Sequence, residues 1–155
     1  MTPDANSSLD SAPDFRFVIG DWAQMANHAK PIRYEVFVLE QRVPLALEWD
    51  EMDAVSLHVV AYDTSHQPIG TARLLPDGHI GRMAVRQPVR GQGAGSGLLR
   101  TLLKLAQQRG DAAVLLHAQL QAENFYRRHG FLRDGEEFIE AGIAHVCMRQ
   151  DFSPE

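Results

Sequence analysis

The chain has 155 residues, of which 45% are hydrophobic, and it carries a formal net charge of −5 at neutral pH. This length suits one globular domain with a single substantial core. The acidic balance argues against general nucleic-acid binding, which needs a basic face. No apolar run approaches the ~18 residues of a membrane-spanning helix. We therefore expect neither nucleic acid nor a membrane among its partners.

The compartment is indicated by the cysteine content and the first residues. A single cysteine, Cys147, excludes an internal disulfide and fits a reducing cytoplasm. Residues 1–14 are rich in Ser, Asp, Asn and Pro and lack the charged and apolar regions of a signal peptide. We predict a disordered tail over 1–14, a single domain over 15–152 and a cytoplasmic location.

The first elements are a strand and two helices. Residues 15–20 read as a strand, and Asp21 can cap a helix that begins at Trp22 or Ala23. Pro31 suits the first turn of a second helix, which runs through Gln41. The apolar face of that helix is made of Ile32, Val36 and Leu39. Residues 43–53 lack periodicity and are acidic, so they read as a loop.

Three strands follow, at residues 57–62, at 69–75 and from His79 to Val85. The segment 76–78, Pro-Asp-Gly, is a strong hairpin signal before the third of them. A long helix is expected over 93–108, because leucines recur at helical spacing and Gly110 can end it.

A glycine-rich segment, Arg90-Gly91-Gln92-Gly93-Ala94-Gly95, joins the third of these strands to the long helix. Glycines there let backbone N–H groups turn toward an anion, and the helix dipole adds partial positive charge. It is not a P-loop, since no lysine follows Gly95. It is not a Rossmann fingerprint either, since Asp111 precedes the next strand instead of ending it. The segment predicts a phosphate or pyrophosphate site.

The remaining elements are a strand at 113–118, a short helix at 122–129, and a closing hairpin of residues 131–138 and 145–150 around Gly142. The continuous apolar character of 113–118 is typical of a buried, parallel strand. The order of elements predicts an α/β fold, in which a mixed sheet carries helices on both faces.

The segment Arg90–Gly95 resembles the Arg/Gln-x-x-Gly-x-Gly/Ala motif of the GCN5-related N-acetyltransferases (GNAT). Residues 122–131 resemble a second family segment, Ala-x-x-Phe-Tyr-x-x-x-Gly-Phe. Residues 36–53 are similar to the bacterial ElaA-like or YjcF-like subgroup of this family. The resemblance covers about residues 15 to 150. It implies a mostly antiparallel sheet with a V-shaped splay between its fourth and fifth strands.

The resemblance also implies acetyl-CoA as co-substrate and assigns residues to it. The pyrophosphate would lie on the glycine-rich segment, and the pantetheine arm would pair with a bulged strand and with side chains from the following strand and helix. The residues implied are Met83, Ala84, Val85, Arg90, Gly91, Gln92, Gly93, Ala94, Gly95, Ser96, Gln119, Asn124, Phe125 and Tyr126. Gln119 stands where the family often has Asn, and it keeps the amide on a longer stem.

Acetyl transfer needs an acid for the departing thiolate and a base for the amine. By resemblance, Tyr126 is the acid, and a backbone amide near Val85 polarises the carbonyl. His79 is the first candidate for the base, because alternation puts it on one strand face with Gly81 and Met83. Glu40 and Glu48 are further candidates, either as bases with raised pKa values or as counter-ions for the amine. His117 is possible, but reads better as a structural histidine.

The expected function is transfer of an acetyl group from acetyl-CoA to a primary amine of a small molecule or protein, by direct attack in a ternary complex. Two alternatives stay open. One is an acyltransferase like the acyl-homoserine-lactone synthases, which share this fold and use S-adenosylmethionine. The other is a non-catalytic acyl-CoA sensor. The histidines lack metal-binding spacing, so no catalytic metal is expected. A homodimer is possible.

Overall fold

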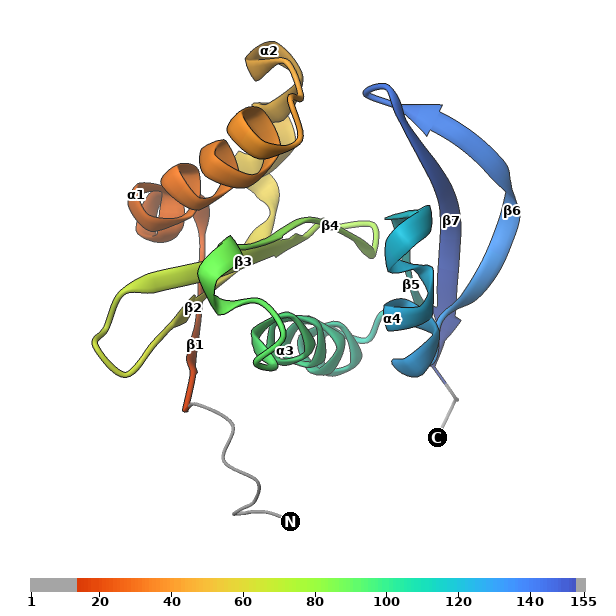
Figure 1. Ribbon diagram of the computed structural model, residues 1–155. Helices are drawn as coiled ribbons and strands as arrows, with labels where there is room; N and C mark the ends of the chain where they lie inside the picture. Colours follow the sequence, from red (N-terminus) through yellow and green to blue (C-terminus); the bar gives the residue numbers. More distant parts are fainter. Residues whose placement is uncertain (1–13, 153–155) are drawn as a thin grey trace.

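The computed structural model describes residues 14–152, so the predicted tail lies almost entirely outside the described residues (Figure 1). One seven-stranded sheet has the order β1-β2-β3-β4-β5-β7-β6. Every neighbouring pair is antiparallel except β4 and β5, which are parallel. The strands are β1 (Arg16–Gly20), β2 (Leu57–Tyr62), β3 (Pro68–Leu74), β4 (His79–Val85), β5 (Ala113–Gln119), β6 (Leu132–Glu140) and β7 (Ile143–Asp151). The mixed, mostly antiparallel sheet is as predicted.

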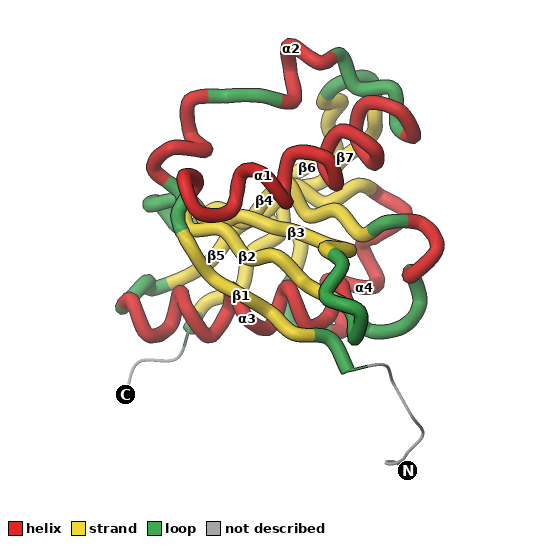
Figure 2. The backbone as a smooth tube through the Cα atoms, turned by 90° about the vertical axis from the view of Figure 1, so that its left-hand side faces the viewer, coloured by secondary structure: helices red, strands yellow, loops and turns green. Residues whose placement is uncertain are grey.

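Helices cover both faces of this sheet (Figures 1 and 2). The helices are α1 (Trp22–Arg33), α2 (Leu45–Glu48), α3 (Ala94–Arg109) and α4 (Glu123–Arg128). The larger core lies under α3, where Leu98, Leu99 and Leu102 are fully buried. A smaller core lies under α1, around Ala29 and Ile32. Among residues 14–152, no helix is both long and apolar enough to cross a membrane.

Two helix ends follow from the local sequence as expected. Asp21 caps α1 through a capping box, in which its carboxylate accepts from the Gln24 backbone N–H at 2.9 Å and the Gln24 side chain accepts from the Asp21 N–H at 2.9 Å. Gly110 ends α3 in a left-handed conformation, with φ of 94°. Gly97 allows α3 to sit close to β1, because a Cβ there would lie 2.1 Å from the Phe17 ring.

The predicted splay between β4 and β5 is present. The two strands pair at only two positions, His79 with Leu115 and Ile80 with Leu116, and then diverge. β4 also carries the expected bulge, since three steps from Gly81 to Ala84 match two steps on β3 and Arg82 has φ of +49°.

The bulge changes which side chains share a face. Met83 and Val85 pack against the same core as Ile80, whereas Ala84 lies in the core under α1. The prediction that His79, Gly81 and Met83 share one face by simple alternation is therefore wrong. An extra residue in the strand reverses the alternation after the bulge.

A second helix beginning at Pro31 was also a wrong prediction. Pro31 lies inside α1, which continues directly into a π-helical segment, Tyr34–Glu40. The wider π turn shifts the phase of the apolar face. Ile32 and Val36 are buried as predicted, but Leu39 is 61% exposed.

The segment 43–53, predicted as a loop, contains α2 and the start of a 3₁₀ turn, Glu51–Val55. Ion pairs of Arg33 with Glu48 and Asp53 hold this segment on α1. The closing hairpin of β6 and β7 is as predicted, and β6 is the exposed edge of the sheet (Figure 1).

Candidate active site

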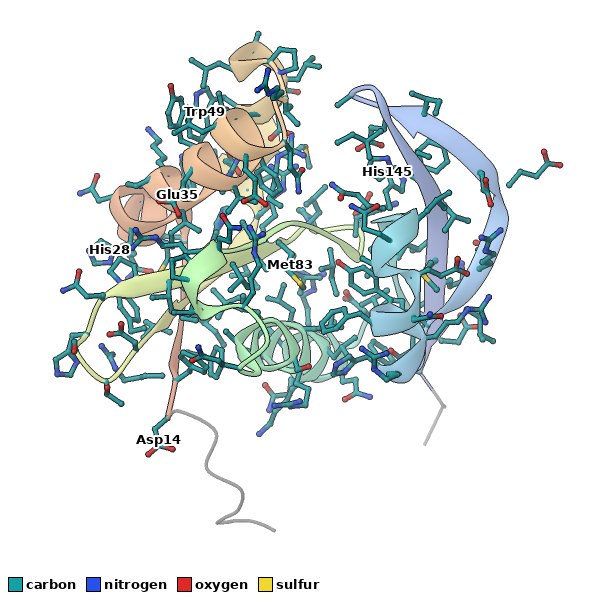
Figure 3. The ribbon with its side chains drawn as sticks, in the orientation of Figure 1. Asp14, His28, Glu35, Trp49, Met83 and His145 are labelled. Carbon is teal, nitrogen blue, oxygen red and sulfur yellow. The ribbon has the colours of Figure 1, made fainter. Side chains whose placement is uncertain are left out.

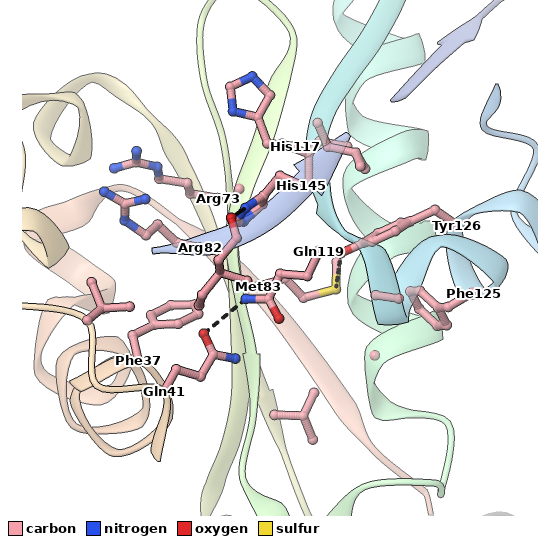
Figure 4. Close-up of a pocket in the computed structure, with 18 of the residues that line it drawn as sticks. Phe37, Gln41, Arg73, Arg82, Met83, His117, Gln119, Phe125, Tyr126 and His145 are labelled. Atoms are coloured by element: carbon pink, nitrogen blue, oxygen red, sulfur yellow. Dashed lines mark hydrogen bonds between the residues drawn. The ribbon is translucent and has the colours of Figure 1, made fainter. Parts of the chain in front are cut away.

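A cavity of about 1020 Å³ occupies the splay between β4 and β5 and the space above it. Its walls come from the π-helical segment and α2 on one side and from β5, α4 and the β6–β7 hairpin on the other (Figure 4). The segment leading into α3 closes its lower end. Segments distant in sequence therefore meet around one opening between the two diverging strands.

The glycine-rich segment forms the end of the cavity next to α3. Gly91 and Gly93 have φ of +80° and +95°, and a Cβ on either would meet nothing within 4 Å. Both glycines thus face open space in a conformation that other residues adopt only with strain. The first backbone N–H groups of α3 have no acceptor inside the helix. The arrangement can cradle an anion such as a pyrophosphate.

The bulged strand faces α4 across the slot. The Tyr126 hydroxyl lies 3.9 Å from the Met83 sulfur, and the Phe125 ring packs against Tyr126 with ring centroids 5.1 Å apart (Figure 4). Burial raises the pKa of Tyr126 to about 12. This phenol therefore stays protonated at neutral pH and can act as a hydrogen-bond or proton donor inside the slot.

The structure gathers most of the residues predicted to bind the cofactor, but not all. Gln119 lines the cavity, and its amide donates to the Gln41 side chain at 3.0 Å across the slot (Figure 4). Gln92 and Asn124 are exposed and are not among the lining residues. The side chain of Ala84 is buried under α1, so only its backbone is available to a ligand.

Glu40 is paired with the first residue of the glycine-rich segment. Its two carboxylate oxygens lie 2.7 and 2.6 Å from the Arg90 guanidinium, which also donates to the Val85 carbonyl at 2.8 Å. The hydrogen bonds from Arg90 lower the pKa of Glu40. A general base would need a raised pKa, and we expected one from burial of Glu40. Instead, Glu40 is exposed and paired with Arg90, so its pKa is lowered.

Glu48 is 1% exposed and lies in a network of charged side chains. Its carboxylate accepts from Arg33 at 2.8 Å, and Arg33 also pairs with Asp53 at 2.8 Å. Burial raises the pKa of Glu48, against the opposing effect of the Arg33 guanidinium. Because Glu48 is already paired with Arg33, it is a poor counter-ion for an amine.

The network continues to the cavity wall through two more arginines. Arg73 pairs with Asp50 at 2.7 Å and with Asp53 at 2.9 Å. Arg82, at the bulge, pairs with Asp50 at 3.0 Å. The Arg33 guanidinium carbon lies 5.1 Å from the ring centroid of Trp22 and 5.2 Å from that of Trp49. Figure 3 shows Trp49 beside α1. Trp49 is thus an anchor on α1 and not a cavity residue.

Sequence reasoning missed this network, and in particular Arg33. The acidic content of 43–53 was visible, but Arg33 was placed inside a predicted helix that runs through Gln41, with nothing to mark it as a partner of that segment. The acidic segment could have suggested a basic partner, but not which one, nor that the pairing is buried.

Three histidines, His79, His117 and His145, line the upper part of the cavity. His79 Nδ1 lies 3.0 Å from Asp77 but makes no hydrogen bond with any part of residues 14–152, and this nitrogen atom is inaccessible to solvent. His117 lies with its ring centroid 5.9 Å from that of His79. Within residues 14–152 no group of three or more His, Cys, Asp or Glu side chains is arranged to hold a metal ion. Burial raises the pKa of Cys147, which disfavours a reactive thiolate.

Residues 24–152 match the acetyltransferase (GNAT) domain family. The chain belongs to this family. A Bacillus subtilis protein described as an uncharacterized N-acetyltransferase, YjcF, is 39% identical over 124 residues, which are 77% of this chain and 88% of that protein. The family and the arrangement of the cavity together identify an acyltransferase.

Solved structures agree with this assignment. An acyl-CoA N-acyltransferase from Pseudomonas aeruginosa has a TM-score of 0.79 and 31% identity, covering 88% of this chain and 99% of that one. ElaA from Escherichia coli has a TM-score of 0.79 and 25% identity, with coverage of 88% and 99%. The GNAT fold of this acyltransferase implies use of an acyl-CoA.

Proposed function

We propose that this acyltransferase moves the acetyl group of acetyl-CoA to a primary amine by direct attack in a ternary complex. The observation that carries the proposal is the position of the glycine-rich segment at the end of the cavity, continuous with the bulged strand and with Tyr126. A pyrophosphate on the first N–H groups of α3 would send the pantetheine arm into the splay between β4 and β5.

The residues of the slot divide the work of this reaction. Backbone groups of the bulge at residues 83–85 pair with the pantetheine amides and polarise the thioester carbonyl. Gln119 offers an amide to the pantetheine once it separates from Gln41. Tyr126 protonates the departing thiolate, whose pKa is near the ~8.5 of a cysteine thiol. A base drawn from the imidazoles of the cavity wall takes the proton of the amine.

Calorimetric titration with acetyl-CoA, coenzyme A and S-adenosylmethionine tests the proposal. We expect acetyl-CoA to bind with a dissociation constant near 1 μM, or about −8 kcal/mol. A panel of polyamines, amino acids and aminoglycosides, scored by release of free thiol, then identifies the acceptor class. Binding of S-adenosylmethionine with no affinity for either CoA compound would contradict the proposal. Binding of acetyl-CoA without turnover of any amine would instead indicate a sensor.

A further inference from the structure

The three cavity histidines form one continuous aromatic wall. His79 lies on β4, His117 on β5 and His145 on β7, in the order of the sheet. Ring centroids are 5.9 Å apart from His79 to His117 and 5.1 Å apart from His117 to Phe138. Phe138, on β6, stacks on His145 at 5.8 Å. The imidazoles therefore contact one another directly or through Phe138, while the side chains of His79 and His117 remain 37% and 43% exposed to the open cavity.

His117 differs from His79 and His145 in its hydrogen bond to a carboxylate, because His79 Nδ1 lies 3.0 Å from Asp77 without forming one and His145 bonds to a backbone carbonyl. His117 Nδ1 lies 2.8 Å from Oε1 of Glu140. A carboxylate only accepts hydrogen bonds, so Nδ1 carries the proton and Nε2 of the neutral ring is left with its lone pair. No hydrogen bond to Nε2 is present among residues 14–152. His145 Nδ1 bonds to the Ile143 carbonyl at 2.7 Å, and within residues 14–152 it has no hydrogen bond to a carboxylate.

The place of His117 along β5 is at the start of the splay. The last pair between β4 and β5 is Ile80 with Leu116, so His117 is the first β5 residue beyond the point where the strands part. Gln119 lies two residues further toward the open end, on the same strand face and about 7 Å away. A pantetheine arm that enters beside α3 passes Gln119 first. We expect its thioester, a few bonds beyond the last amide, to lie beside His117.

We propose that His117, oriented by Glu140, is the general base of the transfer; this rests on the function proposed above. Nε2 of His117 takes a proton from the ammonium form of the acceptor. The amine lone pair then forms the C–N bond as the C–S bond breaks, and Tyr126 gives its proton to the departing sulfur. Through solvent, the surplus proton of the new amide nitrogen restores the Tyr126 hydroxyl. His117 releases its proton to solvent, so one proton is produced per acetyl group transferred.

Two nucleophiles separate a base from a merely structural histidine. Ethylamine is protonated at neutral pH and needs a base, whereas hydroxylamine is already unprotonated. In the His117→Asn variant we expect release of free thiol from acetyl-CoA to fall about 100-fold or more with ethylamine. With hydroxylamine we expect little change. The control His66→Asn, in an exposed turn where φ is +64°, should leave both rates unchanged.

The outcomes of this comparison are distinct. An equal loss with both nucleophiles would show that His117 only shapes the cavity, and no loss with either would remove it from the reaction. A deep, ethylamine-specific loss in His79→Asn but not in His117→Asn would assign the base to His79 instead. Glu140→Gln, as a change to a positioning residue, should slow the ethylamine reaction about 10-fold and leave acetyl-CoA affinity unchanged.

Nitrogen-15 NMR of the histidine rings tests the assignment without an acceptor. We expect His117 in the Nδ1-protonated tautomer, and the Glu140→Gln change should shift it toward the other tautomer. Its ring signals should move on addition of acetyl-CoA, while those of His66 stay fixed. If calorimetry detects acetyl-CoA binding but the His117 signals do not move, the base assignment fails and the proposed function stands. If acetyl-CoA does not bind, the proposed function itself fails.

Discussion

Two walls of the cavity are made in different ways. From Met83 to Ser96 the chain builds its surface from backbone: a bulge, two glycines with positive φ and the start of a helix. The wall made by residues 33–53 relies on side chains, and its charged groups are joined to Arg73 and Arg82 from the sheet. Backbone recognition suits a part of the ligand that never changes, such as a pyrophosphate. Side-chain walls suit recognition of a particular ligand, because their shape and charge depend on which residues stand there.

The largest expected effect concerns the side-chain wall. Arg33→Met should lower the free energy of unfolding by about 3–5 kcal/mol, because it leaves Glu48 and Asp53 buried without their partner. Urea unfolding monitored by circular dichroism measures this. Arg149→Met is the matched control, because its ion pair with Asp151 is exposed, and we expect it to change stability little. Equal effects in the two variants would show that the buried network does not stabilise the wall made by residues 33–53.

Tyr126→Phe addresses the slot between the two walls. We expect kcat to fall about 100-fold, because the departing thiolate loses its proton donor, with little change in acetyl-CoA affinity. Thiol release and calorimetry measure the two quantities. Tyr62→Phe is the control: its hydroxyl is 2.6 Å from His28, in the smaller core away from the cavity. A wild-type rate in Tyr126→Phe would remove this tyrosine from the chemistry.

The pH dependence of stability reports on the charged wall through Asp50. Arg73 lowers the pKa of Asp50 from 3.8 to about 2. Because the pKa of Asp50 is lower in the folded protein than in the unfolded chain, its ionised carboxylate stabilises the fold. This stabilisation is complete at pH values above the unfolded-state pKa and is lost as the pH falls through 3.8 toward 2. Allowing for partial exposure, Asp50→Asn should cost about 1–2 kcal/mol at pH 7. The difference in the free energy of unfolding between Asp50→Asn and wild type should be smaller at pH 3 than at pH 7.

Urea unfolding at pH 7 and pH 3 measures that difference. Asp134→Asn, at an exposed position on β6, is the control and should track wild type at both pH values. A gap between Asp50→Asn and wild type that stays constant between the two pH values would mean that Asp50 contributes by shape and not by charge.

The smallest effect is expected where the two walls touch. Glu40→Gln breaks an exposed ion pair with Arg90, so the free energy of unfolding should fall by less than about 1 kcal/mol. Acetyl-CoA affinity should stay equal or rise slightly, because removal of a nearby carboxylate favours an anion at the glycine-rich segment. Calorimetric titration measures the sign and the size of the change in acetyl-CoA affinity. A large loss of affinity would instead make the pair part of the binding site.

The succession of strands along the chain, the cap at Asp21 and the position of the glycine-rich segment could be predicted from the sequence, because each depends on local alternation or on a turn residue. The exposure of Leu39, and the faces of β4 on which His79 and Met83 lie, could not be predicted in this way. A π turn and a bulge are departures from the very periods used to read them. The pairing of Arg33 with Glu48 and Asp53 was also hidden, since it depends on how distant segments pack.

Binding of acetyl-CoA to paired glycine variants tests the backbone wall most directly. Gly93 and Gly110 flank α3 with φ of +95° and +94°, and a Cβ at either meets nothing within 4 Å. Aspartate should therefore cost both variants a similar 1–2 kcal/mol of backbone strain. We predict that Gly93→Asp lowers acetyl-CoA affinity at least about 100-fold, or 2.7 kcal/mol, while Gly110→Asp binds like wild type. Equal affinities in the two variants would contradict recognition of the cofactor by the glycine-rich segment.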